Sequence, residues 1–327
     1  MPSTLIVLSA RLGAVLPVAA LPALRSAEQV YADHTVPEDV VAELGAERAG
    51  EWPSDGPPGD AWVLLTTDPK HAMGEHAHEV IETPEPPGAA LLDAVAVMDR
   101  LRSPGGCPWD AEQTHRTLLQ YLVEECYELH QAVEDADRPA LREELGDVLL
   151  QVLFHSRLAQ EGGVPPFPAG PASPPFGIDE VAEDLVSKLV GRHPHVFARD
   201  PDRLDQADRV RTAHEQERRW DELKRAEKSR ESALDGVALG QPAAALAAKL
   251  ISRAAKAGVP KELMSSANEL FDRVAAAKLA GGDPEQRLRD GARSFAADLR
   301  AAEDAARAAG LDPHRLTDAD WRRYWPR

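Results

Sequence analysis

Three glutamates fall within five residues of one another in an otherwise apolar stretch of the sequence. The segment YLVEECYELHQAVE covers residues 121–134 and contains Glu124, Glu125 and Glu128. Like charges three or four residues apart on a helix repel each other, and an ionised carboxylate buried without a partner costs far more free energy. The spacing therefore indicates that something positively charged lies against these carboxylates.

A second acidic pair follows in the segment REELGDVL, where Glu144 and Asp147 are three residues apart. Glu125 and Glu128 have the same spacing. A helix advances about 100° per residue, so each pair projects from one face. Two antiparallel helices facing each other would gather four carboxylates, and hard divalent cations such as Mg²⁺ prefer oxygen ligands. The sequence therefore favours a divalent-cation site.

A solvated helix face and a site for iron or zinc are the alternatives to a site for Mg²⁺. A single acidic pair at this spacing is typical of a solvated helix face, but two pairs with mostly apolar neighbours leave little polar face to solvate the acids. A di-iron site in a helical bundle would need Glu-x-x-His pairs, and neither segment has one. His193 and His195 flank one proline without further ligands for zinc, so we expect a helix-ending turn there. The apolar neighbours are Leu122, Val123, Cys126, Leu129, Leu145, Val148 and Leu149.

The periodicity around the acidic residues predicts the helices that position them. We expect Asp110 to cap a helix that has Gln113 at its third position and runs to about Asp135, and a second helix that begins near Asp137 and ends at the QEGG segment. A proline-rich loop without periodicity covers 162–177. Further helices are expected over 90–103, 179–192 and about 204–228. These elements form a helical bundle.

The first 88 residues are predicted to form a small α/β domain. Strand-like runs occur at TLIVL (4–8) and AWVLLTT (61–67), a helix is expected over LPALRSAEQVYA (21–32), and proline-rich breaks follow. The segment distantly resembles the tetrapyrrole methylase domains that precede related catalytic domains, but it is too short to be a working one. We expect a degenerate, methylase-like unit.

The C-terminal part, 236–327, is predicted to be a degenerate repeat of the acidic helices. Its sequence from 265 onward aligns with that from 120 onward at a single offset of 145 residues. Glu124 matches Glu269 under this offset, but no candidate cation ligand is retained. Glu125, Glu128, Glu144 and Asp147 fall on Leu270, Arg273, Arg289 and Ala292. We therefore expect a second helical bundle that cannot bind the cation.

Charge and cysteine content limit the partners of the chain. The formal net charge is −18 over 327 residues, so the phosphate backbone of a nucleic acid would repel it. Only Cys107 and Cys126 are present, which is too few for a disulfide framework and fits a reducing cytoplasm. No stretch approaches about 18 uninterrupted apolar residues, so we expect no membrane span.

Four sequence blocks, in order, resemble the MazG family of nucleoside triphosphate pyrophosphohydrolases. The resemblance covers about residues 89–235. It implies a dimeric all-α enzyme that uses Mg²⁺, for which Mn²⁺ can substitute, to convert a nucleoside triphosphate into the monophosphate and pyrophosphate. The blocks are CPWDAEQTHRTLLQYLVEECYELHQAV, LREELGDVLLQVLFHSRLA, SKLVGRHPHVF and RWDELKRAEK.

The resemblance also implies roles for individual residues. Glu124 either supports the ligands or acts with Glu125 in catalysis, as a base for water. Gln113, Thr114 and His115 are expected near the base or sugar. The metal ligands that it implies are Glu125, Glu128, Glu144 and Asp147. Helical spacing places Lys188 and Arg192 on one face, where they could bind the phosphates, and Trp220 and Lys224 repeat that spacing. The alternatives for these four residues are a solvated face and a core aromatic.

The sequence therefore predicts a mainly α protein with a catalytic helical bundle over 89–235, which hydrolyses nucleoside triphosphates and cleans the nucleotide pool. The alternative is a non-catalytic regulatory module that binds nucleotide or a protein partner through the acidic bundle. Retention of all five acids, of Lys188 and of Arg192 argues against that alternative.

We predict that Lys188→Ala and Arg192→Ala impair the handling of the triphosphate. The two cations are four residues apart and would share one helix face. Steady-state kinetics should show a raised KM if they bind ground-state phosphates, or a lowered kcat if they meet charge formed in the transition state. If both variants showed wild-type kinetics, Lys188 and Arg192 would be solvated helix residues with no role in substrate binding.

Overall fold

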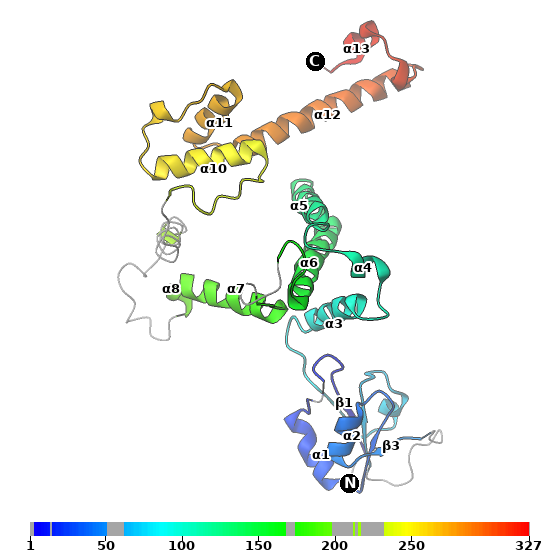
Figure 1. Ribbon diagram of the computed structural model, residues 1–327. Coiled ribbons are helices and arrows are strands. Elements are labelled where there is room, and N and C mark those ends of the chain that lie inside the picture. Colours follow the sequence, from blue (N-terminus) through cyan, green and yellow to red (C-terminus); the bar gives the residue numbers. More distant parts are fainter. Residues whose placement is uncertain are drawn as a thin grey trace. The chain divides into compact units, whose positions relative to one another are not determined.

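The computed structural model describes residues 3–13, 15–50, 62–167, 174–197, 212, 215–216 and 232–326. Its contacts divide the chain into two compact units, Met1–Gly191 and Arg192–Arg327. Helices predominate among the described residues, and the strands are confined to the N-terminal region (Figure 1). The predicted division at residues 88 and 235 stays a prediction.

The N-terminal region is a five-stranded parallel sheet with the strand order β3-β2-β4-β1-β5. The predicted α/β character and the strands at both apolar runs are confirmed. Its strands are β1 (Thr4–Val7), β2 (Gln29–Ala32), β3 (Glu47–Arg48), β4 (Trp62–Thr66) and β5 (Glu79–Glu82), and its helices are α1 (Leu21–Ser26) and α2 (Glu38–Leu44).

The helix predicted over 21–32 is only half right. Helix α1 ends at Ser26, and the QVYA segment forms β2 instead. Strand β2 lies between β3 and β4, where Tyr31 and Ala32 are buried. Its Val30 and Tyr31 belong to the residue types that favour strands, and burial in the sheet decides the conformation of this short segment.

Apolar side chains pack on both faces of the sheet, as expected for parallel strands. Ile6, Val63 and Leu65 belong to the cluster that includes the residues of α2. Leu5 and Leu64 belong to the cluster on the other face. Continuous apolar runs such as TLIV and WVLLT therefore follow from burial on two sides.

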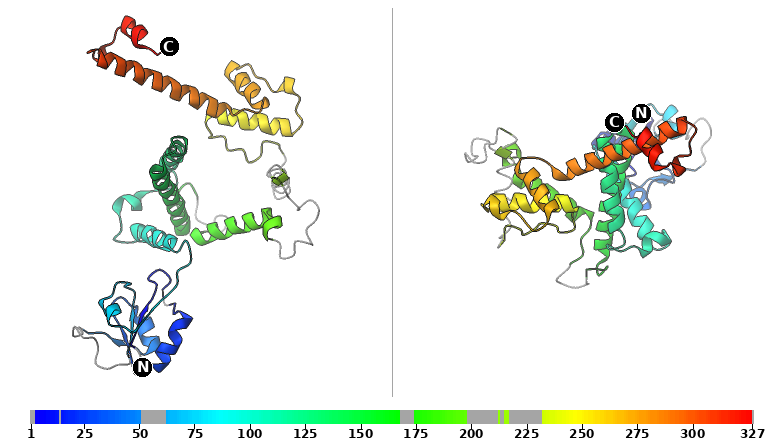
Figure 2. Two further views of the ribbon diagram at one scale, coloured as in Figure 1. Left: turned by 180° about the vertical axis from the view of Figure 1, so that it is seen from behind. Right: turned by 90° about the horizontal axis from the view of Figure 1, so that it is seen from above.

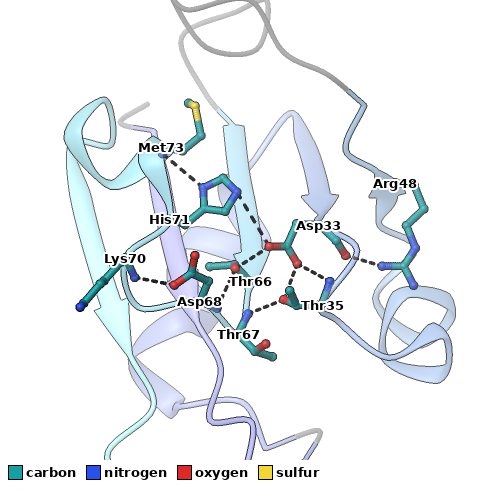
Figure 3. A network of polar contacts seen from close by, with 9 residues as sticks. All are labelled: Asp33, Thr35, Arg48, Thr66, Thr67, Asp68, Lys70, His71 and Met73. Carbon is teal, nitrogen blue, oxygen red and sulfur yellow. Dashed lines mark hydrogen bonds and ion pairs between the residues drawn. The ribbon is translucent and has the colours of Figure 1, made fainter.

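A closed polar network surrounds Asp33, which directly follows β2 (Figure 3). One carboxylate oxygen accepts hydrogen bonds from the backbone N–H and hydroxyl of Thr35, and the other accepts one from the Thr66 hydroxyl at 2.6 Å. His71 Nε2 lies 3.8 Å from the same carboxylate. Burial alone would raise the pKa of Asp33, but the hydrogen bonds from Thr35 and Thr66 lower it below its ordinary value.

Two long helices, α5 (Leu119–Glu134) and α6 (Arg138–Glu161), pack against each other as a helical hairpin, and α3 (Ala90–Arg102) packs on α6 (Figure 2). Asp137 caps α6 by accepting a hydrogen bond from the N–H of Ala140, as the predicted start requires. The predicted helices at 90–103 and 179–192 are also confirmed. The other helices of this part of the chain are α4 (Pro108–Glu112), α7 (Ile178–Arg192) and α8 (Pro194–Phe197).

The prediction that Asp110 caps the acidic helix is wrong. Asp110 lies inside the short helix α4, whose N-cap is Cys107, and Gln113 ends that helix. The chain then turns before α5 begins at Leu119. The side chain of Arg102 donates hydrogen bonds to the backbone carbonyls of Asp110 and Gln113. These carbonyls are therefore held by a tertiary contact that the local pattern does not reveal.

Two helices of the C-terminal unit lie at the sequence positions that the proposed repeat predicts, but they pack differently from α5 and α6. Helices α11 and α12 lie close to where the offset of 145 residues places α5 and α6. However, α11 packs mainly on α10, while α12 extends past both and meets α13 at its far end (Figure 1). The bounds are α10 (Ala243–Lys256), α11 (Glu269–Leu279), α12 (Pro284–Ala308) and α13 (Asp318–Tyr324).

No helix among the described residues is both long enough and apolar enough to cross a membrane. The helix predicted over about 204–228 lies outside the described residues, apart from 212 and 215–216.

We predict that Thr66→Val weakens the sheet region and makes it more sensitive to acid. The variant loses the hydrogen bond that Thr66 donates to a buried carboxylate, which should cost about 1–3 kcal/mol. It also loses the hydrogen bond that the Thr66 hydroxyl accepts from the backbone N–H of Asp68. A lowered folded-state pKa means that Asp33 contributes stability above its unfolded pKa of about 3.9, and that this stability is lost as pH falls through the folded value. In the variant, the loss should begin at a higher pH.

Hydrogen exchange followed by mass spectrometry on β4 peptides, from pH 7 down to pH 3, measures this effect. Thr67→Val is the matched control, because only the backbone N–H of Thr67 joins the network. Equal protection in both variants at every pH would contradict the role given to the Thr66 hydroxyl.

Candidate metal and nucleotide site

The α5–α6 hairpin brings acidic side chains from both helices together. One carboxylate oxygen from each of Glu125, Glu144 and Asp147 lies within 4.8 Å of the other two. All three side chains are half-buried. Residues 125 and 147 are far apart in sequence, so the packing of the hairpin itself creates this group, which we call the acidic cluster.

Glu128 adjoins the acidic cluster. Its negative charge acts on both Glu125 and Glu144 and helps to raise the pKa of each. Glu124, which directly precedes Glu125, is exposed and is not one of the three clustered residues. The structure therefore brings three of the four predicted ligands together, while Glu128 and Glu124 are exposed on α5 outside this group of three. Their roles at the site stay predictions.

The electrostatics of the acidic cluster favour a bound cation. Burial raises the pKa of Glu125, and repulsion by Asp147 and Glu128 raises it further. Burial also raises the pKa of Glu144, followed by repulsion from Glu128 and Asp147. The donors are all carboxylate oxygens, the set that suits a hard divalent ion. A cation here would relieve the repulsion, so these residues fit a divalent metal.

The predicted phosphate-binding residues lie on α7. Lys188 is exposed and makes no hydrogen bond or ion pair with the described residues. Arg192 is buried at the end of α7, and its backbone carbonyl accepts a hydrogen bond from Gln216. Trp220 and Lys224 lie outside the described residues. The roles of these four residues stay predictions.

The turn between α4 and α5 carries Gln113, Thr114 and His115. The His115 ring stacks on the His155 ring of α6 at 5.1 Å between centroids, and their Nδ1 atoms are 2.8 Å apart. Burial lowers the pKa of both imidazoles. Phe167 meets His115 edge-on. The turn therefore rests on α6, but beyond the acidic cluster.

Comparison with known protein families identifies two regions of the chain. The model of the MazG nucleotide pyrophosphohydrolase domain matches residues 113–197, which include the acidic cluster, Lys188 and Arg192. The model of the MazG N-terminal domain matches residues 3–81.

Relatives extend the match over most of the chain. A nucleoside triphosphate pyrophosphohydrolase of Mycolicibacterium smegmatis is 42% identical over 82% of this chain and 81% of its own length. One of Mycobacterium tuberculosis is 37% identical over 95% and 91%, respectively. The Thermotoga maritima pyrophosphohydrolase MazG is 31% identical over 73% and 95%. The chain belongs to the MazG family of nucleoside triphosphate pyrophosphohydrolases.

In this MazG chain, sequence reasoning missed the residues that hold the α4–α5 turn in place. Arg102 forms an ion pair with Glu161 at 2.7 Å, and its hydrogen bond lowers the pKa of that carboxyl. Trp109 packs edge-on against Tyr121 of α5 and Phe154 of α6. Two sequence features could have indicated these residues. Trp109 follows a proline that begins a helix, and Arg102 is the last residue of α3.

We predict that Glu125→Gln raises the thermal stability of the metal-free protein. The folded-state pKa of Glu125 is raised, so its ionised form destabilises the fold, and this loss grows as pH rises through the unfolded pKa. Melting temperatures in EDTA at pH 8 should therefore increase, and added Mg²⁺ should stabilise the variant less than the wild type.

Glu112→Gln is the matched control, because Glu112 is exposed on α4 and absent from the acidic cluster. If both variants responded to EDTA and Mg²⁺ like the wild type, repulsion within the acidic cluster would not limit stability.

Proposed function

We propose that this chain hydrolyses nucleoside triphosphates to nucleoside monophosphates and pyrophosphate with Mg²⁺ as the cofactor. The observation that carries the proposal is the acidic cluster, in which three carboxylates from two helices lie within 4.8 Å of one another. Such a cluster suits a cation that also binds phosphate oxygens. Mn²⁺, another cation that prefers oxygen ligands, is proposed to substitute.

The proposed ligands are Glu125, Glu128, Glu144 and Asp147. When bound, Mg²⁺ supplies positive charge that offsets the charge of the reacting phosphate groups. The hairpin contributes by fixing its carboxylates before the substrate arrives. Glu124, exposed beside the acidic cluster, is positioned to support the ligands or to accept a proton from the attacking water.

The proposed phosphate contacts come from α7 and from the segment after α8. Lys188 is exposed and available to a ligand, and Arg192 follows it by one turn. Cationic side chains of this kind neutralise the phosphate oxygens that do not contact the metal. Trp220 and Lys224 are proposed to complete the substrate site.

Homodimerisation is proposed because the hairpin carries apolar side chains that its own unit does not cover. Val123 and Tyr127 on α5 and Leu145 on α6 are between 41% and 53% exposed. Contiguous exposed apolar surface marks an interaction site, and a second copy of the same hairpin offers a matching surface.

The proposed cellular role is nucleotide-pool cleaning in the cytoplasm. The catalytic part is proposed to span 89–235, between a degenerate α/β domain and the C-terminal helices. The described C-terminal residues contain no acidic cluster, since Arg273 and Arg289 stand at two of the repeat positions and pair with Glu269 and Glu285. One active site per chain follows from this division.

We predict that Asp147→Asn lowers the turnover of nucleoside triphosphates by orders of magnitude while the helix content stays unchanged. The amide cannot supply the negative charge that holds the cation. Pyrophosphate release should be measured with Mg²⁺ and with EDTA, and folding by circular dichroism.

Glu143→Gln is the control, because Glu143 is exposed on the same helix and outside the acidic cluster. A wild-type protein that bound nucleoside triphosphates with no Mg²⁺-dependent release of pyrophosphate would support the non-catalytic regulatory module instead.

A further inference from the structure

Gln151 lies on α6 one turn beyond Asp147 and is 4% exposed. Its side-chain carbonyl oxygen, Oε1, is buried and has no hydrogen-bond partner among the described residues. Buried amide carbonyls are almost always hydrogen-bonded, so an exception asks for a donor from outside the fold. Gln151 interrupts the apolar run LLQVLF, where Leu or Val would pack without this cost.

The carbonyl belongs to the same face of α6 as the acidic cluster. At about 100° per residue, Glu144, Asp147 and Gln151 fall within about 60° of arc. Four residues of helix separate Asp147 from Gln151 by about 6 Å along the axis. His155 continues this face by one more turn, and its Nε2 is also buried without a partner among the described residues. The face therefore presents acids, then an amide, then an imidazole.

Aromatic side chains border the same region from α4 and α5. Tyr121 precedes Glu125 by one turn, so both lie on one face of α5. The Trp109 ring meets Tyr121 at 6.0 Å and Phe154 at 6.5 Å between centroids, yet Trp109 is 50% exposed. An aromatic wall open to solvent thus lies beside the turn of α6 that carries Gln151.

We propose that Gln151 binds the sugar of the nucleoside triphosphate by accepting a hydrogen bond from a ribose hydroxyl. The inference rests on the proposed function, because it places the triphosphate at the acidic cluster. The sugar is bonded directly to the α-phosphate, so it reaches about one helical turn from the cation site. Phosphate oxygens accept hydrogen bonds and cannot satisfy Oε1, whereas a hydroxyl donates one.

The choice of the sugar over the base follows from the same chemistry. Hydroxyls are present in every nucleoside triphosphate, whereas exocyclic amino donors occur on only some bases. The distance along α6 also favours the sugar, because the base lies farther from the phosphates. Trp109 packs against Phe154, and His155 follows Gln151 by one turn of α6, so both rings lie near the part of α6 beyond Asp147.

The test compares four substrates with wild type and variants: ATP, 2′-deoxy-ATP, 3′-deoxy-ATP and 2′,3′-dideoxy-ATP. In the wild type, the KM for the dideoxy substrate should exceed that for ATP by about 5- to 10-fold, the size expected for one hydrogen bond. The two single deoxy substrates identify the hydroxyl that contributes. The kcat should change little, because the contact is made in the ground state.

Gln151→Met keeps the length of the side chain and removes its polar atoms. Its KM for ATP should rise to the wild-type value for dideoxy-ATP, and it should no longer distinguish the two substrates. Its melting temperature should equal or exceed that of the wild type, because a buried polar group without a partner is removed. Ser156→Ala is the matched control, since Ser156 is equally buried but already donates to the Val152 carbonyl.

The proposal is overturned if wild type treats ATP and dideoxy-ATP alike, or if Gln151→Met retains the distinction. Gln151→Leu repeats the measurement should the methionine variant unfold. Failure of the proposed function is separate, because it would leave the wild type without Mg²⁺-dependent hydrolysis. In that case the stabilisation of the wild type by ATP, compared with dideoxy-ATP, still tests Gln151 by melting temperature.

Discussion

The repulsion among the carboxylates of α5 and α6 is the constraint on which the candidate site depends. The hairpin must hold Glu125, Glu144 and Asp147 together although each raises the free energy of the others. Apolar packing elsewhere in the hairpin supplies the stabilising free energy that offsets this repulsion. Leu118 and Phe154, for example, are buried in the core shared by α3, α5 and α6. The acids are thus arranged before any ligand binds, which is the property that preorganised sites require.

Asp33 and the acidic cluster differ in what surrounds their carboxylates. Asp33 is surrounded by donors, namely the hydroxyls of Thr35 and Thr66 and a backbone N–H, and its pKa is lowered. Glu125 is surrounded by other acceptors, and its pKa is raised. The network of Asp33 is complete without a ligand, which is typical of a structural carboxylate. The acidic cluster is completed only by a cation, and this difference marks it as the candidate site.

The sequence predicted those features that depend on the spacing of residues close together in the chain. The acid pairs, the apolar strands and the cap at Asp137 are encoded within a few residues. It did not predict the local conformation where contacts with residues distant in the sequence determine it. The helix expected from Asp110 ends at Gln113, where Arg102 donates hydrogen bonds to two backbone carbonyls. The segment that forms β2 was predicted to be helical, but it pairs with β4. The burial of Gln151 likewise depends on tertiary packing, which the periodicity of the sequence does not predict.

The C-terminal helices show how a similar helical pattern packs in the absence of the acids. At the repeat positions, Arg273 and Arg289 each pair with a glutamate one turn earlier on the same helix. Among the described residues, Glu269 pairs within α11 alone, whereas Glu285 also accepts a hydrogen bond from the backbone N–H of Ala245 on α10. Helix α11 packs mainly on α10, and α12 extends beyond both. Close pairing of two helices along a shared polar face is therefore the feature that serves the metal site, rather than a general property of this helical sequence pattern.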